Sequence, residues 1–524
     1  SAGHGGAPGC FLSIDRARQN ISFCGNVGAK ICEGEKTMEE RKGFGTNFGF
    51  LMAAVGSAVG LGNIWGFPNK MGASGGFTFL IIYLILAVLC GFIVMLGELA
   101  IGRKTGKGAV EAYHVLSKKF KWMGWMGILS AFFILFFYCA LGGYCIKYVV
   151  LNVGDLFGAG FGSNAMAAVA DANGTSVGAE VFGAFLGNPT EAIIYGLIFV
   201  AITMIIVIGG IGGGIEKVCS VGMPALFVML LICIVRACTL DGAVNGLKYM
   251  FVPGWAVANG VIDKAPDFLT VLATAGGQMF FSLSLGMGAM ITYGSYLQKK
   301  ENLQKNAILI IVMDTLVALM AGLCVIPGRF ALDPDGTLGG PKLLFITMQN
   351  VFDRMDAVGP IFGIIFYLLV VFAAISSSIS LLEVIVAHFV DKARDEGKGD
   401  KRKAYTLIAA ACVGLGCILV CADALGTTGF APGNLLGMTG DLPTWAADWL
   451  DFFDMLSEGI MMPLGAMLMS LMIGWEVGPE MVKAECEQSG HAMSGYGFFK
   501  VCVKFITPLC MILILYGQIK EFFF

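Results

Sequence analysis

Long apolar runs, separated by short polar segments, fill the chain from about residue 46 to its end. A helix crosses a bilayer with about 20 mostly apolar residues, and eleven runs reach this length. They lie near 46–68, 77–101, 125–151, 191–210, 218–239, 268–296, 306–328, 358–390, 404–422, 454–475 and 499–518. The pattern predicts an all-α membrane protein with eleven transmembrane helices, which we number as spans 1 to 11.

The first forty residues differ from the rest of the chain. They are rich in glycine, contain three cysteines and lack the apolar stretch of a secretory leader. We therefore expect two parts, with residues 1–40 as a disordered extension and residues 41–524 as the transmembrane domain.

The amino-acid composition indicates what kind of partner surrounds or binds the protein. Apolar residues make up 57% of the chain and charged residues 14%, whereas soluble domains carry roughly a quarter charged residues. We therefore expect a lipid bilayer around the protein, and the net charge of −3 gives no reason to expect a nucleic acid. The 16 cysteines are scattered without a Cys-x-x-Cys pair, so we interpret them as packing residues.

Lysine and arginine predict the orientation in the membrane, because cytoplasmic loops carry an excess of both. The loops after spans 2 and 8 are basic, whereas the loops at 152–190 and 423–450 contain neither residue. The basic residues are Arg103, Lys104, Lys107, Lys118, Lys119, Lys121, Lys392, Arg394, Lys398, Lys401, Arg402 and Lys403. We therefore expect a multi-pass protein of the cell (inner) membrane with a cytoplasmic N-terminus and an external C-terminus.

Spans 1 and 6 are interrupted by glycine near their middle, at 56–63 and 281–288. Glycine weakens a helix interior, and non-helical backbone is tolerated in a membrane only where it lines a cavity. Either span alone would also fit close helix packing. The two lie five spans apart, however, which is the placement expected of a five-plus-five inverted repeat with a central binding site.

The same segments resemble a known family. Residues 56–68 (GSAVGLGNIWGFP) are similar to the first-helix signature of the neurotransmitter:sodium symporter family, and residues 277–286, 373–378 and 214–217 resemble other motifs of that family. The match runs from about Arg41 to the C-terminus, and the eleven spans are similar to those of the prokaryotic eleven-helix type. It implies the bacterial leucine-transporter fold and sodium-coupled secondary active symport of an amino acid into the cell by alternating access.

The resemblance also implies two sodium sites. The first would use the Ala58 carbonyl, the side chains of Asn63, Ser282 and Asp314, and the substrate carboxylate. The second would use the carbonyls of Gly56, Val59 and Ala373 and the hydroxyls of Ser376 and Ser377. Such oxygen ligands suit a hard cation, although serine hydroxyls can also bond to the preceding helical turn. Because the substrate would complete one shell, each ligand should raise the affinity for the other.

The substrate pocket implied by the resemblance combines backbone, hydroxyl and apolar groups. Its residues are Ala58, Gly60, Gly62, Ile134, Tyr138, Phe281, Ser282, Ser284, Met287, Ser377 and Leu381. Tyr138 would bind the carboxylate and Phe281 would close over the ligand. The lining offers no counter-charge for a charged side chain, and Met287 is adaptable where the family often has phenylalanine. We therefore expect a hydrophobic amino acid, including large and aromatic ones.

The residues at the family's inner gate positions match the family, whereas those at the outer gate positions match it only in part. Arg41 and Asp391 occupy the inner gate positions, with Tyr296 nearby, although charges at helix ends can also simply be solvated. On the outer side Asp454 is retained, but Gly66 stands where the family usually has an arginine. Lys70, about one helical turn further on, is a candidate replacement.

The family's chloride site is only partly matched. Tyr83, Gln278 and Ser282 match it, whereas its serine in span 7 is replaced by Ala318. One turn earlier stands Asp314, and a carboxylate at membrane depth is functional by default. Since Asp314 can supply the negative charge that chloride supplies elsewhere, we expect transport independent of chloride.

The sequence also bears on two classes of function other than a carrier. The sequence has no His-Glu-x-x-His motif and its four histidines are scattered, so an enzyme is not expected. The glycine run 210–214 has no strand before it, which makes it a weak signal for a nucleotide loop. A channel or a non-transporting sensor of the same fold would share these patterns, and the sequence leaves that alternative open.

Overall fold

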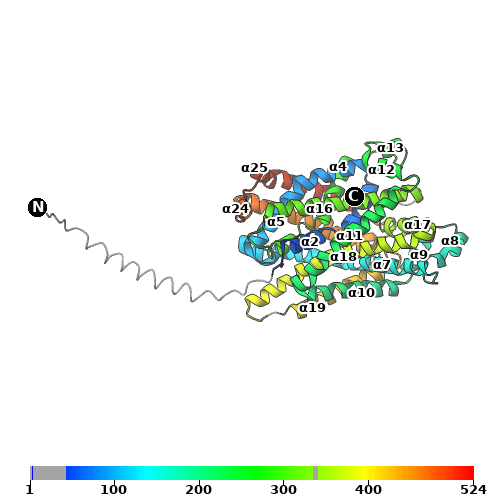
Figure 1. Ribbon diagram of the computed structural model, residues 1–524, viewed down its shortest axis with the longest axis horizontal. Helices are drawn as coiled ribbons and strands as arrows, with labels where there is room; N and C mark the ends of the chain where they lie inside the picture. The colour runs from blue at the N-terminus through cyan, green and yellow to red at the C-terminus, as the bar shows by residue number, and fades with distance from the viewer. Residues whose placement is uncertain (1–2, 4–42, 334–339, 400, 524) are drawn as a thin grey trace. The chain divides into compact units, whose positions relative to one another are not determined.

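The computed structural model describes residues 3, 43–333, 340–399 and 401–523, and these residues form helices without any β-strand. The expected extension 1–40 lies outside the described residues except for Gly3, and so does Arg41. The long helices from residue 43 onward run along a common direction (Figure 1). Their packing follows from the apolar runs, because a helix satisfies its own backbone hydrogen bonds in lipid.

The first five spans comprise α-helices and short π-helical segments. The label η marks these segments and also the 3-10 turns η3 and η6 in the loops. The elements are α2 (Asn47–Ala58), η1 (Gly62–Gly66), α3 (Phe67–Ala73), α4 (Phe77–Leu86), η2 (Ala87–Gly91), α5 (Phe92–Thr105), α7 (Met123–Leu156), α10 (Pro189–Ile208), η4 (Ile211–Ile215) and α11 (Glu216–Cys238).

The remaining spans also consist of α-helices interrupted by short η segments. The elements are α14 (Phe268–Ser282), α15 (Ala289–Gly294), α16 (Leu303–Leu332), α18 (Gly359–Asp395), α19 (Arg402–Asp423), α22 (Trp449–Asp454), η7 (Met455–Met461), α23 (Met462–Leu471), η8 (Met472–Val477), α25 (Tyr496–Val501), η9 (Cys502–Ile506) and α26 (Thr507–Phe523).

Short helices occupy the loops. They are α6 (Ala109–Leu116), η3 (Ser163–Met166), α8 (Ala167–Asn173), α9 (Val177–Leu186), α12 (Ala243–Phe251), α13 (Trp255–Ala258), η5 (Leu343–Thr347), α17 (Met348–Asp353), η6 (Asp356–Val358), α20 (Pro432–Leu435), α21 (Thr444–Ala447) and α24 (Glu480–Glu487).

Most of the predicted spans have a counterpart of membrane-crossing length. Among the described residues, nine helices are long and apolar enough to cross a membrane, and α2 with η1 and α3 forms a further span that is bent by 47°. Predicted span 6 differs, because α14 is only 15 residues long and α15 only 6. The predicted number of eleven therefore depends on counting α14 and α15 as one broken span.

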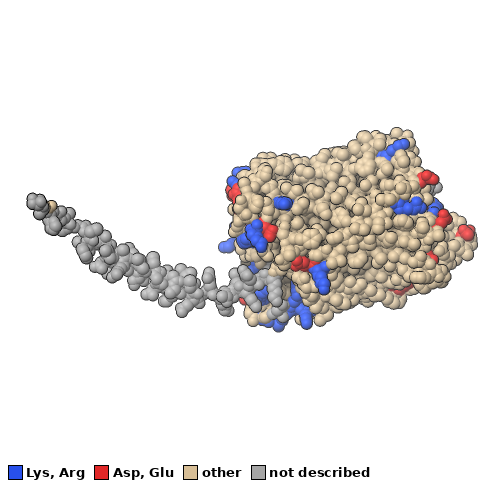
Figure 2. Space-filling view, viewed as in Figure 1, with Lys and Arg blue, Asp and Glu red and all other residues tan. Residues whose placement is uncertain are grey.

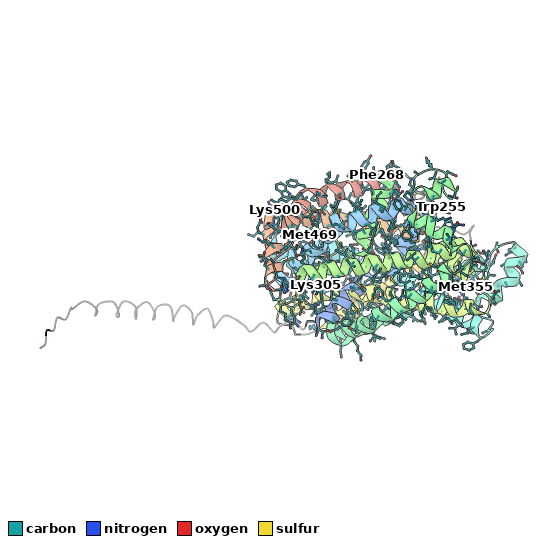
Figure 3. All side chains as sticks on the ribbon, turned by 45° about the horizontal axis from the view of Figure 1, so that its top comes forward. Trp255, Phe268, Lys305, Met355, Met469 and Lys500 are labelled. Carbon is teal, nitrogen blue, oxygen red and sulfur yellow. The ribbon has the colours of Figure 1, made fainter. Side chains whose placement is uncertain are left out.

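Charge separates the sides of the helices from their ends. The face in Figure 2 is mostly tan along its middle, and most of its Lys, Arg, Asp and Glu side chains lie toward the two ends. Apolar side chains such as Val221 and Leu415 are 71% and 69% exposed, as expected of helices that face lipid tails. Figure 3 places Lys305 and Lys500 toward one end of the helices and Trp255 and Met355 toward the other.

Both predicted interruptions are real breaks in the helices. In span 1, α2 ends at Ala58 and Val59 is extended, with φ −73° and ψ 105°. In span 6, Ser284 has a φ of 52° and Gly286 a φ of 83°, backbone conformations that a helix does not allow. A Cβ at Gly286 would also lie 2.1 Å from the Met462 carbonyl oxygen, so glycine is required there.

The broken backbone of span 6 is compensated by a buried acid. The Gly286 amide donates a 2.7 Å hydrogen bond to Oε1 of Glu98, which projects from α5 and is 1% exposed. An amide freed from the helix would otherwise lack a partner away from water. Glu98 therefore stabilises the non-helical segment between α14 and α15.

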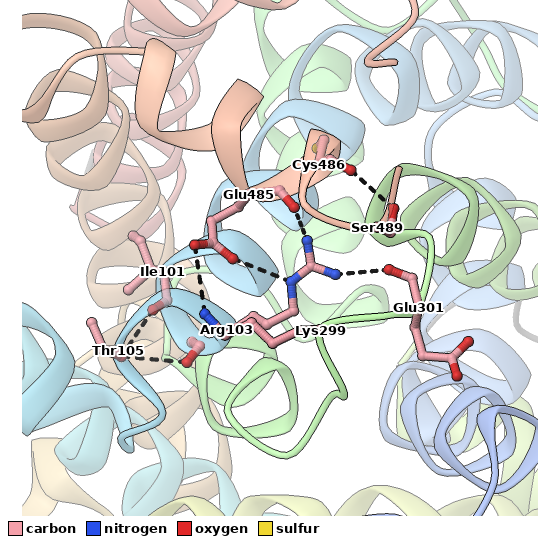
Figure 4. Close-up of polar contacts among 9 residues, drawn as sticks. Ile101, Arg103, Thr105, Lys299, Glu301, Glu485, Cys486 and Ser489 are labelled. Atoms are coloured by element: carbon pink, nitrogen blue, oxygen red, sulfur yellow. Dashed lines mark hydrogen bonds and ion pairs between the residues drawn. The ribbon is translucent and has the colours of Figure 1, made fainter. Parts of the chain in front are cut away.

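Arg103 joins three segments at the basic end of span 2 (Figure 4). Its side chain is 0% exposed, and its Nε donates to Glu485 Oε2 at 3.3 Å. The guanidinium also donates to the Glu301 carbonyl at 2.8 Å and to the Glu485 carbonyl. Because a buried guanidinium needs its donors satisfied, this arginine ties α5 to α24 and to the loop before α16.

Candidate functional site

The two helix breaks face one cavity between α7 and α18. About 260 Å³ among its lining residues is free of protein atoms, and part of this space is open to solvent. Its lining residues are Ala58, Gly60, Gly62, Ile134, Tyr138, Phe281, Ser284, Met287, Ser377 and Leu381. The structure thus brings all the predicted pocket residues except Ser282 to one cavity, and Ser282 lies beside it in a buried polar cluster.

One end of the cavity is polar because the backbone of span 1 is open there. The Leu61 amide donates to the Tyr138 hydroxyl at 2.8 Å. A Cβ on Gly60 would lie 2.2 Å from Ser377 Oγ and 2.3 Å from the Tyr138 hydroxyl oxygen. Glycine therefore allows both hydroxyls to approach the broken backbone. The first turn of η1 begins at this point, and helix N-termini favour a negative group.

The other end of the cavity is apolar. It is formed by Ile134, Met287 and Leu381, with Phe281 alongside. The Phe281 ring centroid lies 6.4 Å from that of Tyr138, so this ring borders both the polar and the apolar end. None of the described residues that line the cavity carries a charge, and a charged ligand side chain would be buried there without a partner.

The first predicted sodium cluster is a buried network around Asp314. Asn63 Nδ2 donates to Asp314 Oδ1 at 2.7 Å and to Ser282 Oγ at 2.9 Å. Ser282 Oγ donates to Asp314 Oδ2 at 3.0 Å, and the Tyr83 hydroxyl lies 3.4 Å from the same oxygen. Asn63, Ser282 and Asp314 are all 0% exposed.

The Asp314 carboxylate has neutral hydrogen-bond partners. Within the described residues, no Lys, Arg or His within 4.0 Å forms an ion pair with it. A buried carboxylate without a positive partner is costly. The cluster is therefore suited to a bound cation, for which it offers carboxylate, amide and hydroxyl oxygens.

The second predicted cluster contains only neutral oxygens. Ser376 Oγ donates to the Val59 carbonyl at 3.2 Å and to the Ala373 carbonyl at 2.9 Å. Ser377 Oγ lies 3.3 Å from the carbonyl oxygens of both Gly56 and Val59. The structure thus gathers all five predicted groups where α2 ends against α18. Ser377 belongs to both this cluster and the cavity.

Sequence reasoning missed the link between the two breaks. The Ser57 carbonyl accepts hydrogen bonds from Ser284 Oγ at 2.9 Å and from Ser377 Oγ at 3.2 Å. It therefore connects span 6 and α18 to span 1. Glu98 was also missed, although an isolated acid within the apolar run 77–101 is the kind of signal that marks a functional position.

The predicted inner gate residues have additional partners. The Tyr296 hydroxyl donates to Glu383 Oε1 at 2.7 Å, and Arg402 binds the same carboxylate with two nitrogens at 2.7 and 2.8 Å. Asp391 accepts from the Gly108 amide at 3.1 Å. Sequence reasoning had identified Tyr296 and Asp391 but not Glu383, while Arg41 lies outside the described residues.

At the predicted outer gate, Lys70 has a carboxylate partner other than the expected one. It forms an ion pair with Glu458, which lies one helical turn beyond Asp454 in span 10. Asp454 is close enough to Lys70 for an electrostatic attraction. The sequence therefore identified the lysine but not its closest acceptor.

Comparisons with known proteins agree on one family. The model of the Sodium:neurotransmitter symporter family matches residues 41–156 and 184–523. An uncharacterized sodium-dependent transporter of Bacillus subtilis is 32% identical over 481 residues, covering 90% of this chain and 96% of that protein. Sodium-dependent nutrient amino acid transporter 1 of Drosophila erecta is 26% identical over 434 residues, covering 72% of this chain and 66% of that protein.

A solved structure is also similar. The crystal structure of MhsT in complex with L-phenylalanine matches with a TM-score of 0.76 at 32% sequence identity, and the match covers 91% of this chain and 100% of that chain.

Proposed function

Because the chain belongs to the sodium:neurotransmitter symporter family, we propose that it carries an amino acid into the cell together with sodium. The family consists of sodium-dependent membrane transporters, not enzymes, and the chain has the bacterial leucine-transporter fold with broken first and sixth spans. The proposal rests on one observation above all. A buried carboxylate with neutral partners lies directly beside a mostly apolar cavity.

Sodium is the co-substrate that would occupy the two oxygen clusters. In the first, it would bind the Ala58 carbonyl, Asn63, Ser282, Asp314 and the carboxylate of the amino acid. In the second, it would bind the carbonyls of Gly56, Val59 and Ala373 and the hydroxyls of Ser376 and Ser377. Because the first sodium and the amino acid would share a contact, binding of one should strengthen binding of the other by the same factor.

The cavity supports a hydrophobic or aromatic amino acid as substrate. The carboxylate of the substrate would bind at the open backbone of span 1 and the Tyr138 hydroxyl, and its side chain would lie among Ile134, Met287 and Leu381. Two similar proteins are consistent with this class, since one is named a nutrient amino acid transporter and the other was solved with L-phenylalanine. Lysine or glutamate would leave a buried charge without a partner.

Alternating access would expose this site to each side of the membrane in turn. Following the distribution of Lys and Arg, we place the protein in the cell (inner) membrane with a cytoplasmic N-terminus and an external C-terminus. Under this orientation the pair Lys70–Glu458 faces outward and the cluster of Tyr296, Glu383 and Arg402 faces inward.

Reconstitution into proteoliposomes tests the proposal. With an inward sodium gradient, radiolabelled L-phenylalanine or L-leucine should accumulate above its external concentration, saturably and with movement of positive charge. Uptake that is unchanged when sodium is replaced would contradict the proposal. Unsaturable flux would indicate a channel, and tight binding without flux would indicate a sensor of the same fold.

A binding screen tests the substrate class separately. Purified protein in sodium buffer should bind phenylalanine, tyrosine, tryptophan or leucine in preference to lysine and glutamate. Met287→Ala enlarges the apolar end and should shift this preference toward larger side chains. A preference of the unmodified protein for a charged amino acid would refute the proposed class.

A further inference from the structure

The loop after span 3 is joined to the short helix α17 and to η5 by one apolar and one polar set of contacts. In the apolar set, Phe182 of α9 stacks on Phe345 of η5 with ring centroids 5.6 Å apart. In the polar set, the Asn350 side chain of α17 accepts from the Gly178 amide at 2.9 Å and donates to Ser176 Oγ at 3.0 Å. The loop and α17 therefore share one interface, and a group that titrates within it changes how tightly they are held together.

Two carboxylates at this interface share a single hydroxyl. Ser163 of η3 is 0% exposed, and its Oγ lies 2.6 Å from Asp155 Oδ2 of α7 and 3.0 Å from Asp353 Oδ1 of α17. A serine hydroxyl carries one hydrogen, so it donates to one acid at a time, and the shorter distance assigns that hydrogen to Asp155. The contact between Ser163 and Asp353 then lacks a hydrogen unless Asp353 carries a proton of its own.

The second oxygen of Asp353 also favours a neutral side chain. Among the described residues, Asp353 Oδ2 is buried without a hydrogen-bond partner, which is costly for an ionised carboxylate. The Gln349 amide donates at 3.0 Å to Oδ1 instead. An ionised Asp353 would therefore keep part of its charge away from both water and donors.

The charges around Asp353 do not compensate for its burial. Arg354, its neighbour in sequence, binds Asp333 at 3.2 Å. Burial raises the pKa of Asp353 to about 6, and the charge of Asp155 acts in the same direction, whereas Gln349, Ser163 and Arg354 act against it. The titratable groups that face Asp353 from the elements packed against α17 are Asp155 and the phenol of Tyr148 on α7 and the phenol of Tyr367 on α18.

We propose that Asp353 binds a proton at this interface and that the protonated form fastens the loop after span 3 to α17. The neutral Asp353 donates to Ser163 Oγ, which gives its own hydrogen bond to Asp155, so that one negative charge is shared by the three groups. Loss of the proton leaves two carboxylates around one hydroxyl, and their repulsion loosens the loop. This contact does not depend on the proposed function, and only its exposure to the pH outside the cell rests on the proposed orientation.

The direction of the pH effect follows from the state that binds the proton more tightly. A carboxyl group in water has a pKa of about 3.9, so Asp353, with its pKa of about 6, holds a proton more tightly while the loop is docked. Docking is therefore strengthened as the pH falls through 6, and the gain is complete below about pH 4. Between pH 8 and pH 5 the docking equilibrium should change about tenfold.

Hydrogen–deuterium exchange of the purified full-length protein at pH 8 and pH 5, without amino acid, tests the proposal. After correction for the pH dependence of chemical exchange, η3 and α17 should be about tenfold better protected at pH 5. Asp353→Asn is neutral at both pH values, and its amide can donate to Ser163 as the protonated acid does. This variant should show the acid level of protection at pH 8 and no difference between the two pH values.

Asp171→Asn is the matched control. Asp171 lies on α8 of the same loop and is exposed to solvent. A carboxyl in water keeps its ordinary affinity for a proton whether the loop is docked or not, so this variant should retain the full difference between pH 8 and pH 5.

Each outcome decides the proposal. Equal protection of the unmodified protein at the two pH values, a pH difference that persists in Asp353→Asn, or loss of the difference in Asp171→Asn would overturn it. If Asp353→Asn does not fold, Asp353→Ser takes its place, because serine does not titrate in this range either and should also remove the difference. Exchange is measured without substrate or transport, so a negative result would leave the proposed function standing, and absence of amino-acid binding would leave this result valid.

Discussion

The two oxygen clusters beside the cavity are built from different chemistry. The cluster of Asn63, Ser282 and Asp314 contains a formal negative charge and is completely buried. The cluster around Ser376 and Ser377 contains only hydroxyls and carbonyls, and the carbonyls of Gly56 and Val59 come from the C-terminal end of α2. The negative end of a helix dipole attracts cations, but with only part of the strength of a full charge.

This difference indicates that an ion in the first cluster should interact with the substrate directly, whereas an ion in the second cluster should interact mainly with the helices. Asn63 and Ser282 adjoin the cavity residues Gly62 and Phe281, so an ion at Asp314 would be next to the ligand carboxylate. The neutral cluster instead bridges α2 and α18. An ion there would hold two helices together and would act on the ligand through Ser377, which borders the cavity.

The largest expected effect is that of Asp314→Asn, which removes the only formal charge of the first cluster. A contact with a charged group contributes about 1.5–3 kcal/mol, so the sodium affinity measured through amino-acid binding should fall roughly tenfold to a hundredfold. Uptake should become weaker or newly dependent on chloride. A sodium titration of radiolabelled L-phenylalanine binding measures the effect. Unchanged sodium affinity would show that the carboxylate is structural.

Ser376→Ala together with Ser377→Ala should have a smaller effect on sodium affinity. Each lost contact is neutral and contributes about 0.5–1.5 kcal/mol, so we expect a decrease of about tenfold and loss of concentrative uptake. Ser378→Ala is the matched control, because Ser378 Oγ lies 2.8 Å from Thr203 Oγ1 and outside the cluster. Equal effects of the two sets of variants would remove the second sodium site from the proposal.

The smallest expected effect is that of chloride on the unmodified protein. Replacing chloride with gluconate should leave uptake intact, because Asp314 already provides a negative charge at the first proposed sodium site. The measurement is sodium-driven uptake into proteoliposomes prepared without chloride, compared with Asp314→Asn under the same conditions. Full loss of transport by the unmodified protein would show that Asp314 does not replace chloride.

Much of the fold could be predicted because a membrane helix is recognisable from a run of neighbouring residues. An apolar run of sufficient length must form a helix in lipid, and glycine within such a run weakens the helix at that point. These two rules located the spans and both breaks. They could not settle whether span 6 counts as one crossing, because α14 and α15 are short and the segment between them is held by distant groups such as Glu98.

The candidate site was predictable only through the resemblance of the motifs. Read alone, Asn63, Ser282 and Asp314 lie in three separate spans, and no local spacing indicates that they meet. Polar residues missed by that resemblance, such as Ser57 and Glu383, became visible only in three dimensions. Arg103 is a further example, since a basic residue in a predicted loop proves to be buried and bonded to two other segments.

The sequence by itself determined that the chain spans a membrane, where its helices break and which family it resembles, because these properties depend on runs of neighbouring residues. Tertiary structure decided which side chains share a cavity and which charges pair. Asp454 and Glu458 show the reason, since both lie on one helix a single turn apart and either could face Lys70. Only the packing of α3 and α14 against η7 brings Glu458 to the lysine.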